Sequence, residues 1–195
     1  MLRPQGLYKK NALARERDFA RKELRKMLQL PADALIVLGV GYADHRKGID
    51  LFVDAGKKLI SSVPKVYLVW VGLWHNEMQV SIDADLAINT QIKSHFIFPG
   101  RRDDTDLFYA GADVYALTSR EDPFPSVVLE AMDASLPVVG FEGVGGCSEL
   151  LEIGSGKLVP AFDTTALASA LQEILVDQDL ANQMGKIGKT QIRER

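Results

Sequence analysis

Asp122 and Glu130 are two carboxylates separated by seven residues: the first lies in a charged, proline-containing turn, and the second on the helix predicted to follow it. The apolar run 113–117 before the turn predicts a buried strand, so both carboxylates belong to one strand–turn–helix unit. Glu130 lies four residues after Ser126 and therefore on the same helix face. Free backbone amides at Ser126 and Val127 can point at a phosphate or a sugar oxygen. Such a unit can bind a phosphorylated ligand that also carries hydroxyl groups.

Each of these carboxylates also has a simpler explanation. Asp122 can be a turn or cap residue, and Glu130 can be an ordinary solvated carboxylate on a helix. Taken one at a time, the two residues favour these simpler explanations. Pro125 has no amide hydrogen to offer a ligand, and it suits the first position of the helix.

A second group of candidate residues, Arg46 and Lys47, lies in the loop 41–50, where the next helix is expected to begin. Cations at the start of a helix oppose its dipole and are mildly unfavourable. An anion bound at the free amides of the helix start would reverse that effect. The loop alone does not decide between a phosphate site and two solvated cations.

A glycine-rich loop, 143–149, follows the predicted strand 137–140 and contains three glycines and Glu149. Glycine allows a positive φ and a close approach of the backbone to a ligand, although a tight turn explains the cluster nearly as well. The sequence contains no Walker loop and no Gly-x-Gly-x-x-Gly motif, and its three histidines show no metal-ligand spacing. Cys147 has no obvious base partner, which argues against a cysteine nucleophile.

Apolar runs alternate with helical patterns along most of the chain. Strands are predicted at 35–41, 66–72, 95–98, 113–117, 137–140 and 157–159, and helices at 11–29, 48–62, 76–89, 126–135, 164–176 and 178–190. A further short helix is expected to start at 103–106, capped by its own carboxylates. This alternation predicts an α/β fold, an open parallel sheet with right-handed crossovers and helices on both faces. The loops after the strands then share one edge, where such sheets bind their ligands.

The bulk composition is that of an ordinary globular protein, and 195 residues fit one domain with a substantial core. No apolar run approaches the roughly 20 residues of a membrane span, and the N-terminus has no signal-peptide pattern. A single cysteine fits a reducing cytosol, so we expect a cytoplasmic protein. Residues 1–30 carry nine Lys/Arg against three Asp/Glu. Such a basic helix can touch nucleic acid or anionic lipid, but a helix that covers one side of the sheet is favoured.

The three loops, in this order, resemble the C-terminal domain of retaining glycosyltransferases built from two Rossmann-like domains (GT-B architecture), most closely glycosyltransferase family 4. The matching residues are Lys47-Gly48, Asp122, Glu130, Ala131-Met132, Leu136-Pro137-Val138-Val139, Gly145-Gly146 and Glu149. The resemblance covers about 33–185, and the run 113–139 is its specific part. It implies a Rossmann-like open sheet of about six strands over 33–195, with a basic linker helix in 1–32 packed on that domain.

The resemblance assigns a role to each matching position. Lys47, helped by Arg46, would neutralise the diphosphate of a nucleotide-sugar donor. Asp122 would hold hydroxyl groups of the donor sugar, and Glu130 would hold the ribose hydroxyls. Further donor contacts would fall on Gly41, Arg101, Phe124, Ser126 and Val127. No metal or other cofactor is expected, because in such enzymes protein cations and helix dipoles supply the electrostatic stabilisation.

The implied reaction is transfer of a hexose-type sugar from a UDP- or GDP-sugar to a glycan or a lipid-linked acceptor. The acceptor-binding N-terminal domain of such enzymes is absent here, so we expect this chain alone to be inactive, and the longer enzyme to be able to associate peripherally with membranes. Asp122 replaces the usual Glu, Pro125 the usual Gly and Tyr42 the usual Arg, which leaves the donor open. Two alternatives remain: a non-catalytic nucleotide-binding α/β module, and half of a sugar-nucleotide epimerase.

Overall fold

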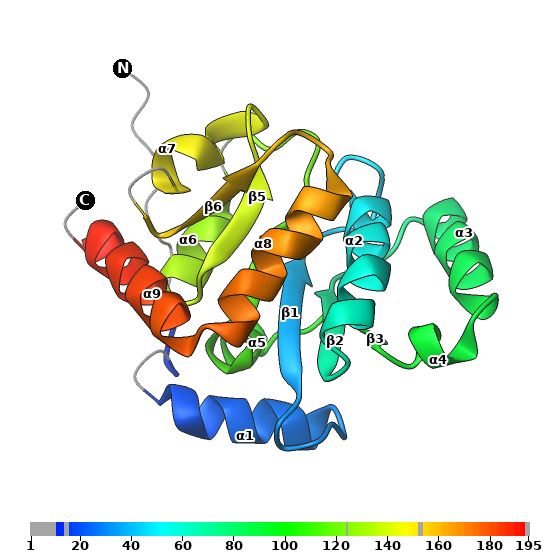
Figure 1. Cartoon of the computed structure of the whole chain (residues 1–195), viewed down its shortest axis with the longest axis horizontal. Coiled ribbons are helices and arrows are strands. Elements are labelled where there is room, and N and C mark those ends of the chain that lie inside the picture. Colours follow the sequence, from blue (N-terminus) through cyan, green and yellow to red (C-terminus); the bar gives the residue numbers. More distant parts are fainter. Residues whose placement is uncertain (1–10, 14–15, 124, 152–153, 194–195) are drawn as a thin grey trace.

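The protein forms a single parallel sheet with helices packed on both faces (Figure 1). The structure is a computed structural model and describes residues 11–13, 16–123, 125–151 and 154–193. The strand order is β3-β2-β1-β4-β5-β6, so the order reverses direction between β1 and β4. The predicted fold class is therefore confirmed. No helix among these residues is long and apolar enough to cross a membrane.

All six predicted strands are present. They are β1 (Leu35–Val40), β2 (Val66–Val71), β3 (Phe96–Gly100), β4 (Val114–Leu117), β5 (Val138–Phe141) and β6 (Gly156–Val159). Their continuous apolar runs are explained by burial on both faces. Alternate residues of β1 enter opposite layers, with Val37 in one core and Ile36 and Leu38 in the other.

The helices form two layers, one on each face of the sheet. Their bounds are α1 (Arg17–Met27), α2 (Ile49–Ser62), α3 (Asn76–Ala87), α4 (Thr90–Lys93), α5 (Thr105–Gly111), α6 (Ser126–Asp133), α7 (Ser148–Leu151), α8 (Thr164–Val176) and α9 (Gln178–Arg193), with a 3-10 turn at Gly145–Cys147. Figure 1 shows α2 and α8 side by side on the near face, and these helices contact each other. Residues of α5 and α6 join the core of the opposite face, and α1 packs against α5.

Several predicted helix details are wrong. The first helix begins at Arg17 rather than at residue 11, and the short helices α4 and α7 were not predicted. Asp104 occupies the cap position of α5, but its side chain makes no capping hydrogen bond. Its carboxylate instead accepts hydrogen bonds from Arg102, at 2.9 and 2.8 Å, because a neighbouring guanidinium is a stronger partner than a backbone amide.

Arginines at every fourth position of α1 bind groups at the amino edge of the sheet. Arg25 donates to the carbonyl oxygens of Ala34 and Gly111 and to the Asp113 carboxylate. Arg17 donates to carbonyl oxygens at the ends of α5 and α6, whose last carbonyls have no partner within the helix. These hydrogen bonds and ion pairs hold α1 on the domain.

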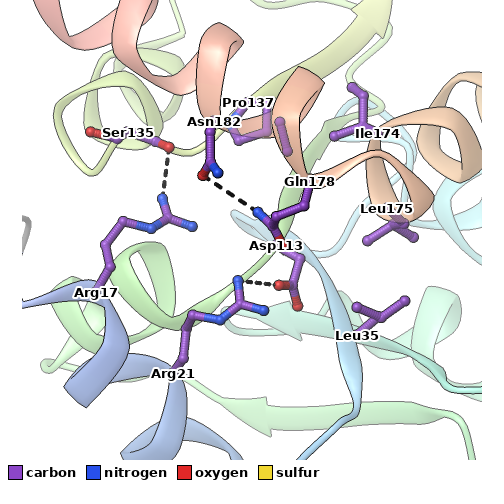
Figure 2. Close-up of a pocket in the computed structure, with 11 residues that line it drawn as sticks. Arg17, Arg21, Leu35, Asp113, Ser135, Pro137, Ile174, Leu175, Gln178 and Asn182 are labelled. Atoms are coloured by element: carbon purple, nitrogen blue, oxygen red, sulfur yellow. Dashed lines mark hydrogen bonds and ion pairs between the residues drawn. The ribbon is translucent and has the colours of Figure 1, made fainter.

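A small pocket lies at the same amino edge, between α1 and α9. Figure 2 shows Arg17 and Arg21 extending into it from α1, with Arg21 directed at Asp113 and Arg17 at the carbonyl of Ser135. Its cavity volume is about 20 Å³, room for about one water molecule. The pocket is too small for a nucleotide and lies at the edge opposite the three candidate loops.

Candidate functional site

The three loops singled out in the sequence meet at the carboxyl edge of the sheet. Gly48 lies so close to the loop after β4 that a β-carbon there would be 2.0 Å from the carbonyl oxygen of Thr118. A β-carbon at Gly145 would lie 1.8 Å from the carbonyl oxygen of Asp122. Both glycines also have positive φ, 71° and 76°, which favours glycine at these contacts. The loop after β4 is thus held between the loop after β1 and the glycine-rich loop.

Lys47 and Asp122 form the centre of this edge. The Lys47 Nζ donates to Asp122 Oδ2 at 2.5 Å, and the two side chains are only 14% and 10% exposed. Lys47 is therefore not a solvated cation, and Asp122 does more than form a turn, because the two side chains pair with each other away from solvent. It brings together the cation and the carboxylate that the sequence placed 75 residues apart.

The backbone around Lys47 is fixed by its neighbours. Its amide donates to the Asp44 carboxylate at 2.7 Å, and its carbonyl oxygen accepts from the Thr118 hydroxyl at 3.2 Å. The Lys47 side chain passes over Gly41 at the end of β1, where a β-carbon would lie 3.4 Å from the lysine methylenes. The carbonyl of Gly41 in turn accepts from the indole of Trp70. Gly41 thus lies beside the aliphatic part of the Lys47 side chain.

Arg120 is a residue of this edge that the sequence did not single out. Its guanidinium donates to both carboxylate oxygens of Asp50, at 2.8 and 2.7 Å, and to the carbonyl of His45. Its backbone amide donates to the carbonyl of Arg46, whose guanidinium reaches back to the carbonyl of Glu121 at 3.2 Å. Arg46 and Arg120 therefore join the two loops. These contacts join residues about 70 positions apart in the chain, so they could not be predicted from a single sequence.

The start of α6 faces the same edge. Pro125 is the cap residue rather than the first helical residue, which is Ser126, so the predicted position of the proline is wrong by one. No side chain caps this helix start among the residues that the structure describes. Ser126 is exposed and Val127 half-buried. Their amides belong to the first turn of the helix, where amides have no partner within the helix.

Glu130 is half-buried on the second turn of α6, so it is not a solvated helix carboxylate. Burial raises its pKa, while the hydroxyl of Tyr109 acts in the opposite direction. The Tyr109 hydroxyl is fully buried and makes no hydrogen bond of good geometry within the described residues. The Tyr109 ring stacks on that of Tyr115, whose hydroxyl donates to the carbonyl of Val40 at the end of β1. The Tyr109 hydroxyl therefore interacts with Glu130, a contact that the sequence alone does not indicate.

The remaining candidate residues either lie away from Lys47 and Asp122 or are not among the residues that the structure describes. Arg101 follows β3, the edge strand two positions from β1, and its side chain is 74% exposed, 4.0 Å from Asp103. Phe124, predicted to offer its amide to a donor, lies outside the described residues. Cys147 is buried, and burial raises the pKa of its thiol, which argues against a nucleophile.

The described residues contain no group of three or more His, Cys, Asp or Glu side chains that could hold a metal ion. The charged groups that meet at this edge are instead one ammonium, two guanidinium groups and the carboxylates around them. Together with an uncapped helix start, they form an arrangement suited to an anionic, hydroxyl-bearing ligand.

The Rossmann-like sheet with this strand order matches the fold of solved GT-B glycosyltransferases. Residues 20–191 match the family model described as "Glycosyl transferases group 1". The chain belongs to the group 1 glycosyltransferase family.

Known proteins agree with this assignment. The chain is 28% identical over 165 residues to the lipopolysaccharide core biosynthesis glycosyltransferase LpsE of Rhizobium meliloti, covering 84% of this chain and 46% of that protein. The structure of Anabaena HepE in complex with UDP and glucose superposes with a TM-score of 0.79 at 25% identity, over 91% of this chain and 48% of that one. A C-terminal domain of the group 1 protein LpcC from Francisella tularensis has the same fold, with a TM-score of 0.77 at 18% identity, over 90% of this chain and 92% of that domain. The chain spans about half the length of the curated relatives it matches.

Proposed function

We propose that the carboxyl edge of the sheet is the nucleotide-sugar donor site of a retaining glycosyltransferase. The observation that carries the proposal is the meeting of Lys47 and Asp122 where the strand order reverses, between β1 and β4. Open α/β sheets bind ligands at this point, outside the carboxyl ends of the strands. The complex of HepE with UDP and glucose supports a donor of the same chemistry.

Each residue of the edge has a distinct role in this proposal. Lys47 neutralises the diphosphate of the donor, and the amides of Ser126 and Val127 hold phosphate or sugar oxygens at the start of α6. Glu130 accepts hydrogen bonds from the ribose, and Asp122 accepts them from the sugar. Arg46 and Arg120 keep the two loops in register.

Binding by fixed cations and amides needs no metal ion, so we propose metal-independent transfer. In the protein that contains this chain, a hexose-type sugar passes from a UDP- or GDP-sugar to a glycan or lipid-linked acceptor held by another domain. This chain supplies the donor half of the site and by itself turns over little donor. The two alternatives, a non-catalytic nucleotide-binding module and half of an epimerase, would bind a nucleotide at the same edge. Sugar transfer by the longer protein would favour the transferase over both.

Isothermal titration calorimetry of this chain with UDP, GDP and ADP tests the donor site. We expect saturable binding of UDP or GDP at one site and weaker binding of ADP. Addition of EDTA should leave the affinity unchanged, because the phosphates are held by Lys47 and backbone amides. The absence of saturable binding for all three nucleotides would reject the proposal.

A further inference from the structure

The ion pair between Lys47 and Asp122 differs from the surface pairs of this protein in its burial. Lys65 and Asp33, a pair on the surface, have side chains that are 68% and 61% exposed, against 14% and 10% for Lys47 and Asp122. Exposed pairs contribute little because water and salt screen them, whereas a buried charge depends on its partner. Asp122 is therefore the main partner of the Lys47 ammonium in this structure, and any other anion must compete with it.

The proposed function gives these two groups different ligand partners. A diphosphate needs the charge of Lys47, which Asp122 already neutralises. Phosphate oxygens that approach the ammonium also approach the Asp122 carboxylate, and like charges in a partly buried site repel strongly. A nucleoside diphosphate without a sugar thus weakens the ion pair between Lys47 and Asp122, and it offers the carboxylate no hydrogen-bond donor as a replacement.

A nucleotide-sugar changes this balance through its hydroxyl groups. Hydroxyl hydrogens of the sugar can donate to the Asp122 carboxylate and replace the interaction that it loses with Lys47. We propose that the Lys47–Asp122 pair makes the site selective for a nucleoside diphosphate that carries a sugar over the same nucleoside diphosphate without one. This inference rests on the proposed donor site and adds to it a reason for discrimination between substrate and product.

The backbone on both sides of the ion pair is held in place by other contacts, so the change of partners involves the side chains of Lys47 and Asp122 and not the two loops. The Lys47 backbone is held by Asp44 and Thr118, and the carbonyl of Asp122 contacts Gly145 and accepts from the amide of Gly146. Only the two side chains need to change partners. A nucleoside diphosphate that has lost its sugar leaves Asp122 without hydroxyl donors, so the carboxylate competes again for Lys47 and the affinity for the product falls.

Calorimetry with UDP and UDP-glucose on the wild-type chain and on Asp122→Asn tests the inference; if GDP binds better, GDP and GDP-mannose are used. The wild type should bind UDP-glucose more tightly than UDP. Asp122→Asn should bind UDP about tenfold more tightly than the wild type, within the usual range of coupling between two ligand groups. Its preference for UDP-glucose over UDP should fall by at least the same factor.

The matched control is Glu121→Gln, which removes one negative charge from an exposed side chain of the same loop. It should leave both affinities within about twofold, because rim charges are screened. A weaker affinity of Asp122→Asn for UDP, or an equal gain in Glu121→Gln, would overturn the selectivity role. Should Asp122→Asn not fold, a wild-type affinity for UDP equal to or above that for UDP-glucose overturns it as well. Failure of the wild type to bind either nucleotide would instead reject the donor site itself.

Discussion

Replacing Lys47 with alanine should weaken the binding of UDP by at least about thirtyfold, the equivalent of about 2 kcal/mol or more for truncating one partner of a buried charge pair. The variant removes the ammonium and leaves the Asp122 carboxylate, only 10% exposed, to face the phosphates without a counter-charge. Uridine carries no phosphate, so its affinity should change by less than about threefold. Calorimetry with UDP and uridine on both proteins measures the difference.

The matched control for this prediction is Lys65→Ala. Lys65 is paired with Asp33 at the amino edge of the sheet, and its side chain is 68% exposed. Its loss removes the same net charge without touching the site, so the affinity for UDP should stay within about twofold. Equal losses of UDP and uridine affinity in Lys47→Ala would show that Lys47 maintains the loop rather than binding the diphosphate.

Replacing Asp113 with alanine should lower the free energy of unfolding by about 3–5 kcal/mol, because it leaves the buried Arg25 guanidinium without its counter-charge. The Asp113 carboxylate accepts from Arg25 and from the amide of Ile36, both at 2.7 Å, and also pairs with Arg21. It therefore joins α1 to the first strand. The midpoint of thermal unfolding should fall by about 6–20 °C for a chain of this size.

Chemical denaturation of Asp113→Ala and of Asp103→Ala provides the measurement and its control. The Asp103 side chain is 97% exposed, so its loss should change the free energy of unfolding by less than about 0.5 kcal/mol. A decrease in the free energy of unfolding of less than 1 kcal/mol in Asp113→Ala would show that the contacts of Asp113 with α1 contribute little to stability.

The sheet was predictable because its strands are buried on both faces and read as unbroken apolar runs. Val66–Val71 and Val114–Leu117 carry this pattern, and both were found where it placed them. The helix start at Arg17 and the missing cap at Asp104 were not predictable in this way. Both depend on distant or competing partners: α1 is held by carbonyl groups 95 and more residues away, and Arg102 takes the Asp104 carboxylate.

The candidate site was predictable as a set of loops but not as a set of contacts. Topology alone places the loops after β1, β4 and β5 at one edge, and the resemblance singled out Lys47, Asp122 and Glu130. The sequence did not indicate that Lys47 and Asp122 pair directly, or that the hydroxyl of Tyr109 interacts with Glu130. Such contacts depend on side-chain directions after the elements have packed, which neither spacing nor periodicity specifies.

A crystal structure of this chain with UDP bound, or with GDP if that nucleotide binds better, tests the donor site most directly. We expect phosphate oxygens within hydrogen-bonding distance of Lys47 Nζ and of the amides at Ser126 and Val127, with the ribose hydroxyls on Glu130. Phosphates bound elsewhere, for example beside Arg17 and Arg21 at the amino edge, would contradict it.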